Sequence, residues 1–103
     1  ITMSREIHRY QFDASVSADE IESTLLLAVL AVEGLHGVSR VRLDASYCFD
    51  PEKYACVIDA CSDVGRDICR IFTGFAIREF GEAAFAVERA ESTPKTETED
   101  LTT

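Results

Sequence analysis

The chain has little positive charge: its 10 lysines and arginines are outnumbered by 19 aspartates and glutamates, which gives a formal net charge of −9. Phosphate backbones and anionic lipid surfaces repel a protein of this charge. We therefore expect neither nucleic acid nor a membrane among its partners. The macromolecular partner that this charge favours is a basic protein surface.

Long apolar segments and an N-terminal signal are also missing. No apolar run approaches the roughly 18 residues that cross a bilayer, and the first residues show no basic segment followed by an apolar stretch. The four cysteines include no C-x-x-C pair and fit neither a disulfide framework nor a zinc pattern. These absences favour a cytoplasmic protein with reduced thiols, for which we expect no metal and no cofactor.

What the sequence does contain is a regular change of hydrophobic period. Alternation of apolar and polar residues predicts four strands, at residues 7–14, 40–49, 54–61 and 84–90. Apolar residues at helical spacing predict two helices, at residues 18–33 and 63–80.

The ends of the predicted helices carry recognisable capping residues. Ser17 and Glu20 form a capping box before the first helix. Gly34 and Gly81 are suited to end the two helices, because glycine adopts the left-handed conformation without strain. Gly74 lies inside the second helix at a cost of about 1 kcal/mol, which suggests a close backbone approach or a bend there.

The order strand–helix–strand–strand–helix–strand predicts an α+β protein with the ferredoxin-like βαββαβ arrangement. We expect a four-stranded antiparallel sheet in the order 4-1-3-2, with two helices on one face and the other face open. The single domain at residues 7–90 would have a flexible N-terminus at residues 1–6 and an acidic, disordered tail at residues 91–103.

The first predicted helix has more leucine than a helix on a sheet needs. Residues 25–32 are all apolar, and Leu26, Leu27 and Leu30 fall outside the stripe that faces the sheet. These leucines fold over the helix edges onto the second helix, or they contact another subunit, since exposed apolar patches mark interfaces. We take them as the candidate interface of a homodimer.

The predicted hairpin places Asp44 and Asp59 opposite each other on the open face of the sheet. Like charges that face across a strand pair are destabilising, and Arg40 and Arg42 are near enough to neutralise them. One interpretation is a solvated network of ion pairs. The other is a carboxylate pair that acts as general acid and base or holds a hard cation, with Asp13 as a further candidate.

Histidines and cysteines supply the remaining candidates. His8 lies on the inward row of the first strand, where a hydrogen-bonded histidine is commoner than a catalytic base. Cys61 is expected on the open face near an arginine, which favours the nucleophilic thiolate. His36 is expected in the connection after the first helix. Cys56 and Cys69 fit the role of small buried apolar residues.

The sequence thus favours a small non-enzymatic protein that binds through self-association or through an acidic protein-interaction surface. The alternative is a small dimeric enzyme or ligand-binding domain with a pocket at the helix/sheet or subunit boundary. The residues that such an enzyme would use are His8, Asp13, Asp44, Asp59 and Cys61.

Overall fold

The computed structural model describes residues 5–92 as an α+β protein with a four-stranded antiparallel sheet and three α-helices. The elements are β1 (Arg5–Phe12), α1 (Ala18–His36), α2 (Val38–Asp44), β2 (Tyr47–Asp50), β3 (Ala55–Asp59), α3 (Asp63–Phe80), the 3-10 turn η1 (Glu82–Ala84) and β4 (Phe85–Ser92). None of these helices is long and apolar enough to cross a membrane.

The outer strands extend past the predicted limits of the domain. β1 begins at Arg5 and β4 ends at Ser92, where residues 7 and 90 were the predicted limits. Arg5 and Glu6 are therefore strand residues, which corrects the prediction of flexibility for that part of the N-terminus. The rest of the predicted flexible N-terminus, at residues 1–4, and of the predicted acidic tail, at residues 93–103, lies outside the described residues.

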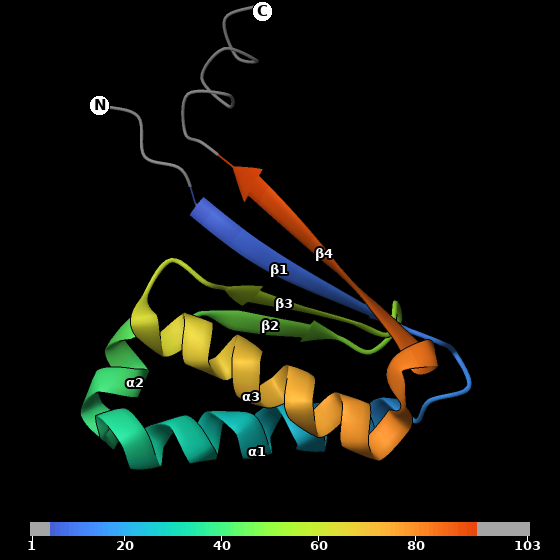
Figure 1. Cartoon of the computed structure of the whole chain (residues 1–103), viewed down its shortest axis with the longest axis horizontal. Helices are drawn as coiled ribbons and strands as arrows, with labels where there is room; N and C mark the ends of the chain where they lie inside the picture. Colours follow the sequence, from blue (N-terminus) through green and yellow to red (C-terminus); the bar gives the residue numbers. More distant parts are fainter. Residues whose placement is uncertain (1–4, 93–103) are drawn as a thin grey trace, which may run out of the picture.

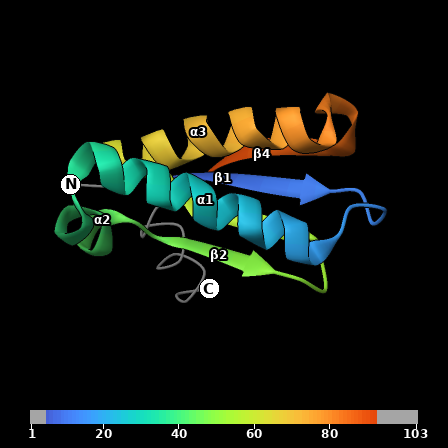
Figure 2. The same cartoon turned by 90° about the horizontal axis from the view of Figure 1, so that it is seen from below.

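The sheet runs in the order β2-β3-β1-β4, and every neighbouring pair is antiparallel. The helices α1 and α3 lie side by side on one face of the sheet (Figures 1 and 2). The described part of the chain places no helix on the other face. β1 is hydrogen-bonded to β3 on one side and to β4 on the other.

The core is centred on Tyr10 of β1, whose side chain is fully buried. The ring of Phe72 from α3 meets it edge-on, with 4.9 Å between ring centroids. The Tyr10 hydroxyl donates to the backbone oxygen of Cys69 at 3.2 Å and bonds the Thr73 hydroxyl at 2.7 Å. Aromatic packing and these two hydrogen bonds together fix α3 on the sheet.

The first helix begins as predicted but ends later. The Ser17 side chain accepts from the Glu20 amide, which confirms the cap. The helix then passes through Gly34 and ends at Gly37, whose φ of 92° lies in the left-handed region. His36 in the added turn contacts Asp67 of α3, and this tertiary contact helps to offset the helical cost of Gly34.

The second predicted strand is wrong over most of its length, because residues 38–44 form the helix α2. Val41 is buried and Ala45 packs against the core, whereas Leu43, which alternation would place beside them, is 84% exposed. Val41 and Ala45 are four residues apart, a spacing that places them on one face of a helix and equally on one face of a strand. Burial of Val41 and Ala45 decides for the helix, and only the four residues of β2 remain extended.

The β2–β3 hairpin is shifted by two residues from its predicted register. Phe49 pairs with Cys56 rather than with Tyr54, and Tyr54 takes a positive φ of 54° in the turn. An even shift leaves every side chain on its predicted face. The predicted inward residues Cys56 and Ile58 are accordingly buried.

The close backbone approach predicted for Gly74 is found elsewhere. A Cβ added at Gly74 would meet nothing within 4 Å, so of the two explanations predicted there, a close approach or a bend, the close approach is wrong. A Cβ added at Gly65, in the first turn of α3, would lie 2.0 Å from the backbone oxygen of Asp59 at the end of β3. Glycine at position 65 therefore allows α3 to start directly against the sheet.

We expect Gly65→Ala to lower the free energy of unfolding by at least about 1–3 kcal/mol, because the new methyl group forces α3 away from β3. The matched control is Gly74→Ala, which should raise stability by up to about 1 kcal/mol through helix propensity alone. Urea unfolding of both variants provides the measurement. A Gly65→Ala variant as stable as the wild type would contradict this packing.

Candidate functional site

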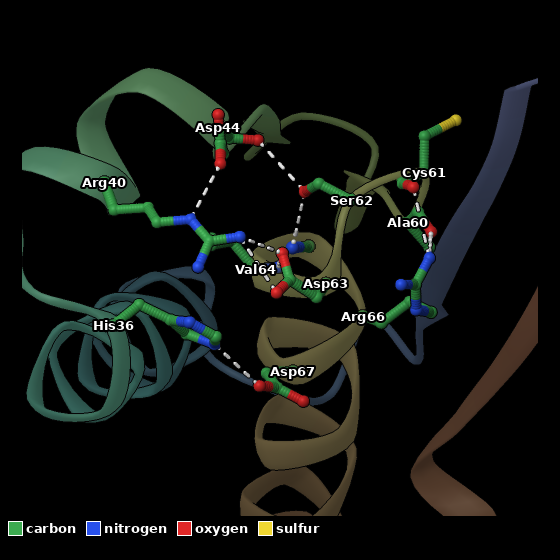
Figure 3. Close-up of polar contacts among 11 residues, drawn as sticks. His36, Arg40, Asp44, Ala60, Cys61, Ser62, Asp63, Val64, Arg66 and Asp67 are labelled. Carbon is green, nitrogen blue, oxygen red and sulfur yellow. Dashed lines mark hydrogen bonds and ion pairs between the residues drawn. The ribbon is translucent and has the colours of Figure 1, made fainter.

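Charged side chains gather where the end of α1, the helix α2 and the start of α3 meet (Figure 3). This polar cluster consists of His36, Arg40, Asp44, Asp63 and Asp67. The Arg40 guanidinium donates through Nη2 to both carboxylate oxygens of Asp63, at 2.8 and 2.9 Å. Its Nε donates to Asp44 at 3.3 Å. Arg40 therefore forms one ion pair within α2 and a second one with the first turn of α3.

The second contact in the polar cluster joins the two long helices. His36 Nε2 lies 2.8 Å from Asp67 Oδ2, and both side chains are mostly buried. No local sequence pattern predicts this pair, since the two residues are 31 positions apart. The sequence placed His36 in a connection after the first helix, whereas it closes the last turn of α1.

Electrostatics in the polar cluster favour the ionised form of the Asp63 carboxylate. Burial pushes the Asp63 pKa upward, but hydrogen bonding and charge from Arg40 outweigh it and hold that pKa below its ordinary value. The same hydrogen bonds from Asp63 raise the pKa of Arg40. These shifts are those of a mutually stabilising ion pair.

The chemistry open to the polar cluster is narrow. No group of three or more metal-ligating side chains occurs in the described part of the chain. The Ser62 hydroxyl donates to the Asp44 backbone oxygen at 3.3 Å and accepts from the Gly65 amide at 3.0 Å. This hydroxyl is therefore committed to capping α3. We interpret the cluster as a clamp between helices.

The structure does not form the predicted Asp44–Asp59 pair across a strand ladder. Asp44 ends the helix α2 and pairs with Arg40, whereas Asp59 bonds through its amide to the Ser46 carbonyl. The Asp59 carboxylate accepts from the Cys61 amide at 2.9 Å. The pairing fails because it required residues 40–46 to be extended.

Glu6, in the segment predicted to be flexible, organises the surroundings of two other candidates. His8 Nε2 lies 3.1 Å from its carboxylate, and Arg89 of β4 forms an ion pair with the same group. The hydrogen bonds from His8 and then from Arg89 lower the Glu6 pKa. The Glu6 amide donates to the Cys61 sulfur at 3.2 Å. His8 and Cys61 therefore both contact Glu6, one at its carboxylate and the other at its backbone.

Cys61 does not have the environment that sequence reasoning gave it. It follows the end of β3, and its nearest arginine contact is from Arg66 to its backbone oxygen at 3.1 Å. In Figure 3 the Cys61 sulfur points away from Arg66. Among the described contacts, the thiol sulfur accepts from the Glu6 amide and none joins it to a cation.

The predicted buried cysteines, Cys56 and Cys69, are both buried. Burial is the main cause that raises the pKa of the Cys56 thiol to about 12 and that of Cys69 to about 11. Cys48 and Cys61 are exposed. The four thiols therefore divide into two structural residues and two accessible ones.

The three candidate interface leucines stay in contact with solvent. Leu26, Leu27 and Leu30 are 45%, 57% and 58% exposed, so α3 does not cover them. A hollow of about 340 Å³ lies between α1 and α3, lined by Glu20, Ser23, Thr24, Leu27, Phe75, Arg78 and Glu79. A second, of about 260 Å³, lies between α1, α2 and β2, lined by Val29, Glu33, Val41, Arg42, Ala45 and Tyr47. Two hollows flank the leucines.

No known protein-family model matches the chain, and no curated protein sequence is significantly similar to it.

Replacing Arg40 by glutamine should flatten the acid limb of the stability curve. A carboxylate with a lowered pKa contributes stability above its unfolded-state pKa and loses it as the pH falls through the folded-state value. The wild type should lose part of its stability below about pH 4, and Arg40→Gln should lose less from a lower starting value. The measurement is urea unfolding at neutral and acidic pH.

Arg70→Gln is the control for that experiment, because Arg70 is 77% exposed and its described ion pair is a long one, at 3.6 Å to Asp67, with no contact to Asp63. Its pH dependence should follow the wild type. Identical curves for all three proteins would mean that Arg40 does not stabilise the Asp63 carboxylate.

Titration with an aromatic disulfide reagent should label Cys48 and Cys61 rapidly in the folded protein. Cys56 and Cys69 should react only after unfolding, because they are buried and their raised pKa values keep them as thiols. Mass spectrometry of the labelled peptides identifies the sites. Rapid labelling of Cys56 in native protein would contradict the described core.

Proposed function

We propose that this protein is a small, non-enzymatic binding protein that associates with a second copy of itself through the outer face of α1. The observation that carries the proposal is the exposure of Leu26, Leu27 and Leu30, about half of each side chain remaining accessible. Leu26 and Leu30 are four residues apart and Leu27 is three before Leu30, so the three form one continuous patch.

The energetics favour a weak dimer. Complete burial of a leucine contributes about 1.5–3 kcal/mol, so the exposed half of each side chain offers about 1 kcal/mol. Association also costs several kcal/mol in lost freedom of motion. Self-association should therefore depend visibly on concentration.

A binding role is also supported by the surroundings of the candidate catalytic residues. Asp44 is engaged by Arg40, and His8 by Glu6. The Cys61 sulfur accepts from a backbone amide. The described contacts join none of these three residues to another of them, as an acid–base pair or an activated nucleophile requires.

A second candidate function is ligand binding at the subunit boundary. The hollow between α1 and α3 has a volume of about 340 Å³, which is within the range of small-molecule sites. Its lining combines Leu27 and Phe75 with Arg78 between acidic neighbours. A basic protein partner remains the alternative that the net charge of −9 favours.

We also infer that the fold is a ferredoxin-like βαββαβ arrangement with α2 inserted before the second strand. Read from the β4 edge, the sheet order β2-β3-β1-β4 is 4-1-3-2. Two long helices on one face support the same classification (Figure 1). A cytoplasmic location is consistent with two exposed free thiols.

The double variant Leu26→Asp/Leu30→Asp should convert the dimer into a folded monomer, because charged side chains cannot be buried against a second apolar face. Light scattering across a concentration series up to about 1 mM measures the mass. Circular dichroism checks that the variant is folded.

Ile77→Asp is the control, because Ile77 is an equally apolar, partly exposed residue of α3 outside the lining of the hollow beside α1. It should dimerise like the wild type. A wild type that stays monomeric at the highest concentration, or a double variant that still dimerises, would refute the proposal.

A further inference from the structure

One side of α1 carries a row of residues spaced by four: Glu22, Leu26 and Leu30. Glu33 continues this row by one turn. It lines the hollow between α1, α2 and β2 together with Arg42 of α2. The row therefore begins with the acid Glu22, has leucines in its middle and ends at the acid Glu33, beside the Arg42 cation.

The two charges at the ends of this row are exposed and uncommitted. Neither Glu22 nor Arg42 has an ion-pair partner among residues 5–92. Arg40, by contrast, is fully engaged by Asp44 and Asp63. A second copy turned end for end would bring Glu22 of each copy toward Arg42 of the other.

We propose that the second copy packs its α1 antiparallel to this one about a two-fold axis, with Glu22 reaching the partner's Arg42. This inference rests on the proposed self-association through α1. If the two-fold axis crosses α1 at the level of residue 28, Leu26 lies against the partner's Leu30, and Leu30 lies against the partner's Leu26. Glu22 lies six residues from that point, about 9 Å along the helix, and so faces the partner's Gly34.

Gly34 suits this position for two reasons. A Cβ added there would meet nothing within 4 Å, so the surface around it is open to a neighbour. It also directly follows Glu33, which shares a hollow with Arg42, so an approaching carboxylate comes close to that guanidinium. The acidic end of α1 thus finds a small residue beside a cation.

The parallel arrangement is disfavoured by the charges of α1. Its first turn contains Asp19 and Glu20, with Glu22 just beyond, and the helix contains no lysine or arginine. Parallel packing would bring these acidic ends together, and like charges across an interface oppose association. The antiparallel arrangement separates them and brings Glu22 to the end of the partner's helix where Glu33 and the Arg42 cation lie together.

Charge reversal tests this arrangement directly. Glu22→Arg and Arg42→Glu should each weaken self-association about tenfold, because either change creates two repulsive contacts per dimer by symmetry. An equimolar mixture of the two variants should associate as tightly as the wild type. In the mixed dimer one contact joins the two substituted side chains and the other joins the native Glu22 to the native Arg42, so both contacts are again attractive.

Sedimentation equilibrium measures the dissociation constants, and native mass spectrometry counts mixed dimers in the mixture. Glu52→Arg is the control: it changes the net charge as Glu22→Arg does, from an exposed turn. It should neither weaken the dimer nor form mixed dimers preferentially with Arg42→Glu.

The result expected is preferential formation of the mixed dimer from Glu22→Arg and Arg42→Glu. A wild type that dimerises through its leucines while the mixture shows no preference would overturn the antiparallel arrangement alone. A wild type that does not dimerise would overturn the proposed function together with this inference.

Discussion

The need to satisfy one buried hydroxyl organises this protein. Tyr10 lies at the centre of the sheet with no exposed surface, and burial raises the pKa of its phenol, so it remains neutral. Its hydroxyl finds partners in Thr73 and in the Cys69 carbonyl, both on α3. An unpaired buried hydroxyl is costly. These bonds therefore favour the rotation of α3 about its own axis, and the position of α3 on the sheet, that bring Cys69 and Thr73 to Tyr10.

The position of α3 determines what happens at the far end of the helical layer. With α3 fixed and Gly65 allowing its first turn against β3, Asp63 and Asp67 are held where α1 ends. His36 and Arg40 meet these carboxylates. The polar cluster is therefore a consequence of the core, and it holds α2 beside the exposed side of α1.

Much of the fold was predictable because its elements are defined by local patterns. Residues 63–80 were expected and found to be helical, and Ser17 caps α1 as its sequence indicated. The prediction fails at residues 38–44, where Val41 and Ala45 suit either a strand or a helix. There the choice depends on what the core can bury, which no local pattern contains.

The candidate site was less predictable for the same reason. The Asp44–Asp59 pair depended on the strand that became α2. His36–Asp67 and Arg40–Asp63 join residues 31 and 23 positions apart. Such contacts require the relative placement of helices to be known. The excess of leucine on α1 was visible in the sequence because it is a departure from amphipathic spacing within one element.

The connections after the two long helices share an architecture. α1 ends at Gly37 with φ 92° and ψ 149°, and α3 ends at Gly81 with φ 89° and ψ 152°; each is followed by a short helical segment and then a strand. Exchanging β1 with β3 and β2 with β4 leaves the sheet order unchanged. The described elements therefore repeat one order: strand, helix, short helical segment and strand. The two repeats differ most where η1 has three residues and α2 has seven. The longer segment, α2, carries Arg40 and Arg42, so these two cations have no counterpart in η1.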